Sequence, residues 1–231
     1  MRNLVIKYTS ILLAIGVLAS CASMNSTQKG AGIGAGGGAV IGGIIGAIAG
    51  DEQGALLGAA IGAAVGGTTG AIIGKQMDKQ AQVIEATIPG AEVEKVNNGE
   101  ALEITFDGNQ DGITFPTNKY DLNESSKANL AKLSSIFQEF PDTYLRVKGY
   151  TDDVGKEEYN MTLSKNRAES VSNFLLTQGV EQVRIETQWF GETLPKVAND
   201  TPENRAKNRR VEVLIVPSQK MVNEAQQAAG Q

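Results

Sequence analysis

The chain has 231 residues, with 21 Lys and Arg, 26 Asp and Glu, one Cys and no His, and its formal net charge is -5 at pH 7. Without His it cannot build a Ser-His-Asp or Cys-His catalytic group or a His-ligated metal site, and one Cys closes no intrachain disulfide. The acidic balance argues against nucleic acid as a partner, because that binding depends on many Lys and Arg contacts with phosphate. We therefore predict no enzyme activity, no catalytic residues, no metal and no cofactor.

Residues 1–20 have the features of an export signal. Arg2 and Lys7 form a basic start, and residues 11–18 form an apolar stretch too short for a lasting membrane span. The next feature, Leu18-Ala19-Ser20-Cys21, resembles the bacterial lipobox, which implies that Cys21 becomes the first mature residue and carries acyl chains such as palmitate. Several acyl chains make membrane anchoring stable. The alternative is a plain secretory signal in which small residues happen to precede a Cys.

After a linker at residues 21–29, residues 30–74 contain 17 of the 27 glycines, and a Gly recurs at every fourth position from Gly30 to Gly74. Ile, Val, Leu and Ala fill the space between them, and Asp51 to Gln53 divide the segment into two apolar stretches. Each stretch has about 20 residues, enough to cross a hydrocarbon core of about 30 Å. In lipid, unpaired backbone groups cost several kcal/mol, so helix is favoured and Gly allows close backbone contact.

The Gly-rich pattern predicts a glycine-zipper helical hairpin that associates with the membrane and turns at Asp51 to Gln53. Such a zipper could also join copies of the chain into a homo-oligomer. The alternatives are a flexible linker, helices lying on the membrane surface, and a single span. A single span would leave the rest of the chain on the opposite side of the membrane from Cys21, whereas a hairpin keeps both on one side.

The C-terminal part has ordinary globular composition. We predict a charged, helical neck at residues 75–90, a domain at residues 91–217, and a tail rich in Gln and Ala at residues 218–231 that is either flexible or a frayed helix. The hydrophobic periods and turn signals predict, in chain order, a hairpin of strands 93–96 and 102–106, a helix between Asn123 and Pro141, a strand at 144–150, a helix at 157–178, and strands at 183–190 and 211–216. Strands that alternate with helices indicate an α+β fold, here a two-layer α/β sandwich.

Three motifs stand out in this domain: Gly-Tyr-Thr-Asp at residues 149–152, Asn-x-x-Leu-Ser-x-x-Arg-Ala at 160–168, and Asn-Arg-Arg-Val-Glu at 208–212. Together they resemble the OmpA-like peptidoglycan-binding domain over about residues 91–217. The order of lipobox, glycine zipper and domain resembles the OmpA-like glycine-zipper lipoproteins of diderm outer membranes. The resemblance implies noncovalent binding of peptidoglycan through the diaminopimelate of its stem peptides.

Asp152 follows a predicted strand, and Asn160 and Arg167 are two helical turns apart on one helix face. An Asp and an Arg in one cleft can hold a zwitterion, because the carboxylate binds an ammonium and the guanidinium binds a carboxylate through two parallel hydrogen bonds. The resemblance assigns these roles to Asp152 and Arg167. It also implies contacts from the side chains of Asn118 and Asn160, from the backbone near Val154, and from Arg209 at the rim.

Less specific interpretations of the same residues stay open. Asp152 and Arg167 could simply pair with each other, Asn160 could cap the start of its helix, and one of Arg209 and Arg210 could be plain surface. Two positions depart from the family pattern. The early Phe115-Pro116-Thr117-Asn118 stretch lacks the usual acidic residue, and Trp189 replaces a usual Gly.

From these features we expect a lipoprotein that is anchored by lipid in the cell outer membrane. Its C-terminal domain should lie in the periplasm and tie the membrane to the cell wall. The alternative is a structural or assembly component that oligomerises through the zipper, with wall binding secondary. In that case, oligomers should disappear when Gly42 and Gly58 become Leu. A stator-like channel is disfavoured because Asp51 lies at a turn rather than inside a span.

Overall fold

Five α-helices and five β-strands follow one another in the part of the chain that the structure describes. This computed structural model covers residues 67–88, 90–106, 112–113, 115 and 118–230. The elements are α4 (Gly67–Thr87), β1 (Glu92–Val96), β2 (Ala101–Phe106), α5 (Glu124–Glu139), β3 (Thr143–Gly149), α6 (Glu157–Thr177), β4 (Ile185–Trp189), α7 (Pro202–Asn208), β5 (Val211–Pro217) and α8 (Gln219–Ala228). The export signal, Cys21 and most of the predicted zipper lie outside the described residues.

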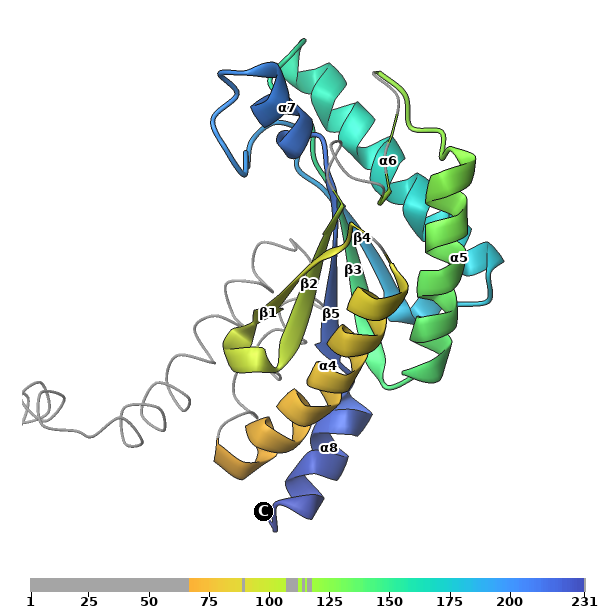
Figure 1. Cartoon of the computed structure of the whole chain (residues 1–231), viewed down its shortest axis with the longest axis vertical. Helices are drawn as coiled ribbons and strands as arrows, with labels where there is room; N and C mark the ends of the chain where they lie inside the picture. The colour runs from red at the N-terminus through yellow and green to blue at the C-terminus, as the bar shows by residue number, and fades with distance from the viewer. Residues whose placement is uncertain (1–66, 89, 107–111, 114, 116–117, 231) are drawn as a thin grey trace, which may run out of the picture. The chain divides into compact units, whose positions relative to one another are not determined.

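The strands form one mixed sheet in the order β1-β2-β5-β3-β4. β3 and β4 are parallel, and the other neighbouring pairs are antiparallel. α6 connects the two parallel strands and packs on both of them. Figure 1 shows α5 and α6 along the same side of the sheet, α7 near the end where β3 finishes, and α8 at the opposite end.

The core lies between the sheet and its helices. Leu145 of β3 lies opposite Ile215 of β5, and Ile215 lies opposite Leu102 of β2, so one row of apolar side chains crosses three strands. The row formed by Val147, Val213 and Ile104 runs beside it, and all six side chains are at most 1% exposed. The helices supply the second layer through Leu130, Leu133, Phe137, Val171 and Leu175, each 0% exposed. The predicted two-layer α/β sandwich is thereby confirmed.

Local signals placed several of these elements correctly. Asn123 caps α5, since its Oδ1 accepts from the backbone N–H of Ser126 at 2.7 Å, and the helix ends before Pro141. The Asn98-Gly99 signal joins β1 and β2, with φ of 57° at Asn98 and 87° at Gly99. The strand expected from residue 183 begins later, because Gln182–Arg184 forms a 3-10 turn. The short helix α7 was not predicted.

Helices extend beyond both ends of the predicted domain at residues 91–217. α4 runs without a break from Gly67, inside the predicted zipper segment, through most of the predicted neck. Residues 219–228, expected to belong to a flexible tail, form α8, which Ser218 caps by accepting from the N–H of Met221. Met221, Val222 and Ala225 lie on one helical face and are buried, so this segment is an ordered helix rather than a flexible tail. Among the described residues, no helix is both long enough and apolar enough to cross a bilayer.

Glu100 is a buried acid that directly follows the turn of the β1-β2 hairpin. It is 5% exposed, and its Oε2 accepts from Asn97 Nδ2 at 3.2 Å. Burial raises the pKa of its carboxyl from 4.5 to about 7. The folded protein therefore keeps the Glu100 proton in a pH range where an unfolded chain has already released it.

We expect Glu100→Gln to stabilise the protein at pH 8 and to change its stability little at pH 4. The wild type loses stability as the pH rises from about 4.5 to about 7, since the unfolded chain gives up the proton first. At pH 8 the variant should be more stable by about 1–2 kcal/mol, because its neutral amide avoids the burial of a charged carboxylate. Urea unfolding of both proteins at the two pH values measures this difference. A difference that does not depend on pH would contradict the prediction.

Candidate ligand-binding site

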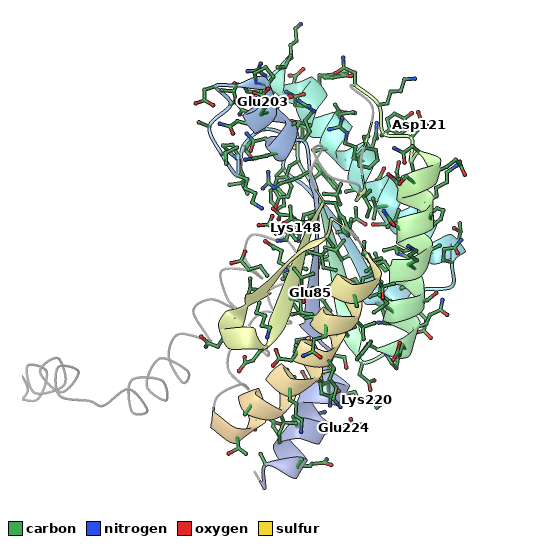
Figure 2. All side chains as sticks on the ribbon, viewed as in Figure 1. Glu85, Asp121, Lys148, Glu203, Lys220 and Glu224 are labelled. Atoms are coloured by element: carbon green, nitrogen blue, oxygen red, sulfur yellow. The ribbon has the colours of Figure 1, made fainter. Side chains whose placement is uncertain are left out.

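The candidate residues gather where β3 ends and α6 begins. This end of the described unit also carries α7 and the segment before α5, where Figure 2 labels Glu203 and Asp121, while Lys220 and Glu224 of α8 lie at the other end. Gly149 sets the local geometry: a Cβ at this position would overlap the carbonyl oxygen of Ser164 and lie 3.2 Å from the Ala168 Cβ. The missing side chain lets α6 approach β3, and Arg167 lies between those two α6 residues in sequence.

Asp152 is 8% exposed and both of its carboxylate oxygens have partners. Oδ2 lies 2.7 Å from Nη1 of Arg209, and Oδ1 accepts from the backbone N–H of Val154 at 3.3 Å. The second bond forms a tight turn around the side chain. Asp152 therefore forms its ion pair with Arg209, and the direct Asp152–Arg167 salt bridge considered from the sequence is not formed.

Arg167 is almost fully buried, at 1% exposed, yet its guanidinium is only partly bonded. Nε donates to the backbone carbonyl of Lys119 at 3.0 Å, and the group lies 5.3 Å from the centre of the Phe115 ring. Within the described residues, no acceptor bonds to its two Nη atoms. Burial, and then the neighbouring charge of Arg209, lowers the pKa of Arg167 to about 10, so it stays positive at neutral pH.

A second buried arginine shows what a purely structural guanidinium does in this fold. Arg184, at the opposite end of β3, donates from Nε to the Thr143 carbonyl, from Nη1 to the Phe137 carbonyl and from Nη2 to the Phe140 carbonyl, all at 2.9–3.0 Å. Its hydrogen-bonding capacity is used by the backbone. The Nη pair of Arg167 has no such acceptors among the described residues, so it is available for a ligand with two acceptor atoms.

Asn160 ties the loop after β3 to α6. It is 1% exposed, and its Nδ2 lies 3.2 Å from the Asp152 carbonyl, 3.3 Å from the Val154 carbonyl and 2.5 Å from Oε2 of Glu192. Asn160 is thus not the cap of its helix, which begins after Lys156. The Val154 side chain is 62% exposed, so Val154 takes part in the site through its backbone N–H and carbonyl groups.

The Asn-Arg-Arg-Val-Glu motif has a different task at each polar position. Asn208 is 0% exposed and fixes the loop before α7, because its Oδ1 accepts from the N–H groups of Lys196 and Val197. Arg209 pairs with Asp152. Arg210 lies over the Tyr150 ring at 3.7 Å and donates to Glu212 at 2.8 Å. The expectation that one of the two arginines is plain surface was therefore wrong.

Beneath the site, Arg210, Tyr150 and Phe190 form a stack across three strand ends. The Tyr150 and Phe190 rings are 5.2 Å apart and nearly parallel, and the Tyr150 hydroxyl donates to Glu212 at 2.8 Å. Burial and the nearby Glu212 carboxylate raise the pKa of Tyr150. Burial opposes the ionisation of Glu212, but Lys148 and Arg210 still hold its pKa below the usual value. The support of the site is therefore a charged layer in which Glu212 accepts from Arg210 and Tyr150, while Nη1 of Arg210 is buried without a partner among the described residues.

Some site residues could not be assigned from the sequence. Phe115 lies under Arg167, although the early motif drew attention only to the missing acid nearby. Glu192 was missed because it lies outside the three motifs, although it follows directly after the Gly191 loop. Asn118 is exposed, adopts φ of 57° and lies next to Lys119, whose carbonyl holds Arg167, so it stands at the edge of the site.

Comparison with known protein families agrees with the geometry. Residues 114–209 match the OmpA family, and residues 1–78 match the YMGG-like Gly-zipper family. The chain therefore matches the OmpA family over most of its C-terminal domain and a YMGG-like glycine zipper over its N-terminal part, as its motifs predicted.

Two relatives and one solved structure give the extent of the similarity. Probable lipoprotein YiaD of Escherichia coli K12 is 36% identical over 141 residues, which cover 61% of this chain and 63% of YiaD. Peptidoglycan-binding protein ArfA of Mycobacterium bovis is 40% identical over 86 residues, covering 37% of this chain and 26% of ArfA. This chain thus spans less than two thirds of either relative. A putative MotB-like protein from Desulfovibrio vulgaris shares the fold, with a TM-score of 0.53, 23% identity, and coverage of 65% of this chain and 96% of that one.

Proposed function

We propose that the described domain binds peptidoglycan noncovalently by holding the free end of diaminopimelate in a stem peptide. The observation that carries this proposal is the Arg167 guanidinium, which is 1% exposed and has two Nη atoms without acceptors in the described residues. A guanidinium with two free Nη atoms can bind a carboxylate through two parallel hydrogen bonds. Such a bond is strong here because a largely buried charge is poorly screened by solvent.

The free end of diaminopimelate carries an ammonium next to a carboxylate. The carboxylate binds the Nη atoms of Arg167, and the ammonium lies toward Asp152. Asn160 keeps the loop of Asp152 and Val154 in place, Arg209 orients the Asp152 carboxylate, and Asn118 contributes a hydrogen bond from the edge. The match to the OmpA family and the similarity to a protein named as peptidoglycan-binding, ArfA, support this assignment.

We further propose that the chain is a lipoprotein that ties the outer membrane to the wall from the periplasmic side. The lipobox-like sequence at Cys21, the YMGG-like segment and the similarity to the probable lipoprotein YiaD support the anchor. A zipper that forms a hairpin keeps anchor and domain on the same side of the membrane. Because many anchored copies meet one polymer, a modest affinity for each stem peptide is enough.

Co-sedimentation of the full-length protein with purified sacculi tests the proposal. In detergent, the protein should pellet with sacculi whose stems contain diaminopimelate, and a soluble tripeptide muropeptide that ends in diaminopimelate should release it. The same muropeptide with its carboxylates amidated should release it poorly, because Arg167 then has no anionic partner. Equal competition by both muropeptides would exclude the proposed role of Arg167, and absence from the pellet would exclude wall binding.

A further inference from the structure

We infer that Glu192 is a second carboxylate of the site and binds the ammonium of the ligand together with Asp152. This inference rests on the proposed function and names a residue that makes the site specific for a ligand with a free amine. Glu192 lies outside the three family motifs, in the loop after β4. Its carboxylate reaches the site through Asn160, the residue that also bonds the loop carrying Asp152.

The position of Glu192 is well defined by its neighbour in the chain. Gly191 has φ of +55°, donates its N–H to Ser164 Oγ at 2.9 Å and accepts from the Thr151 N–H at 2.8 Å. A Cβ at Gly191 would lie 3.2 Å from the backbone N of Met161, so this loop presses against α6. Glu192 follows Gly191 directly, and its Oε2 lies 2.5 Å from Nδ2 of Asn160.

The charges of the site favour a role for Glu192 in binding. Arg209 already neutralises Asp152 at 2.7 Å, and Arg167 adds a second guanidinium. With Asp152 as its single carboxylate, this group of side chains would carry one negative and two positive charges and would favour a plain anion. Glu192 forms no ion pair with any described residue. Its carboxylate and that of Asp152 balance the two guanidinium groups of Arg167 and Arg209. A site without net charge suits a ligand that carries both an ammonium and a carboxylate. Lys119 and Asp153 are exposed, where salt screens their charges.

The hydrogen bonds around Asn160 provide a second, independent indication. Its Nδ2 carries two hydrogens, but three oxygens lie within bonding distance: the carbonyls of Asp152 and Val154 and the carboxylate of Glu192. Asn160 therefore cannot donate a separate hydrogen to each of the three oxygens. An ammonium has three N–H donors, so a ligand amine placed beside Asn160 supplies the missing donor. The site should accordingly prefer stems with a free amine over stems in which that amine is blocked.

Glu192→Gln isolates the charge, because the Gln carbonyl can still accept from Asn160. The test measures binding of full-length wild type and variant, in detergent, to the tripeptide muropeptide and to the same muropeptide N-acetylated at its free amine. The variant should bind the free-amine ligand about 5- to 10-fold more weakly. Both proteins should bind the acetylated ligand equally, since its amide carries no charge for Glu192 to meet.

Matched controls separate this inference from the proposed function. Glu139→Gln, an exposed position at the far end of α5, removes the same charge and should bind both ligands like the wild type. Equal weakening of both ligands by Glu192→Gln would mean that Glu192 acts only on loop structure and would overturn the inference. So would wild-type binding by Glu192→Gln while Arg167→Ala loses binding, a result that leaves the proposed function intact. No loss with Arg167→Ala would reject the proposed site itself, and Glu192 with it.

Discussion

Arg167→Ala should weaken binding of a stem peptide by about 5- to 150-fold, which corresponds to about 1–3 kcal/mol for a lost charge-assisted contact. Arg167→Lys should lose most of the same affinity although it keeps the charge, because an ammonium cannot form two parallel bonds with a carboxylate. Isothermal titration with the tripeptide muropeptide measures both variants. The loss should be larger than for any exposed charge near the site, since Arg167 is 1% exposed and poorly screened.

Arg184→Met is the matched control for a buried guanidinium. Arg184 bonds only to structural oxygens of α5, of the turn after it and of the start of β3, far from the end where the site lies. We expect this variant to unfold at a lower temperature because it leaves buried carbonyl groups unpaired, and to bind the muropeptide like the wild type below its unfolding transition. If both variants lost stability and neither lost affinity, Arg167 would be a structural residue.

Gly149→Ala is expected to have the largest effect on stability, a loss of at least about 3 kcal/mol, at the upper end for overpacking. The new methyl group would overlap the Ser164 carbonyl oxygen and would come within 3.0 Å of its carbon. Both atoms belong to the backbone of α6, so no side-chain rotation relieves the overlap. The helix would have to move away from β3, and Arg167 would move with it.

Urea unfolding followed by circular dichroism measures the Gly149→Ala effect. Gly74→Ala is the control: its nearest neighbour beyond α4 would be the Gly99 carbonyl oxygen at 3.6 Å, an ordinary contact. Since Ala is favoured over Gly inside a helix by about 0.8–1 kcal/mol, this variant should be as stable as the wild type or more stable. An unfolding midpoint for Gly149→Ala close to that of the wild type would show that β3 and α6 are not in close contact.

Gly74 and Gly149 illustrate what a local sequence pattern can predict and what it cannot. Gly74 belongs to a period of four that is visible in the sequence and predicts helix packing. Gly149 is a single residue in a motif, and only the crossing of α6 over the strand explains why it has no side chain. The same limit applies to α7, whose seven residues are too short for a clear hydrophobic period.

The sequence by itself determined the class of fold, the order of most strands and helices, and the presence of Asp152, Asn160 and Arg167 near one strand end. These are consequences of hydrophobic period, caps and turn residues, which act over a few positions along the chain. Only the tertiary structure decided which charges meet. Asp152 pairs with Arg209, 57 positions away, because the register that places Gly149 opposite Val211 brings the two strand ends together. The place of Glu192 also depends on tertiary structure: the packing of its loop on α6, rather than any local pattern, sets the distance between its carboxylate and Asn160.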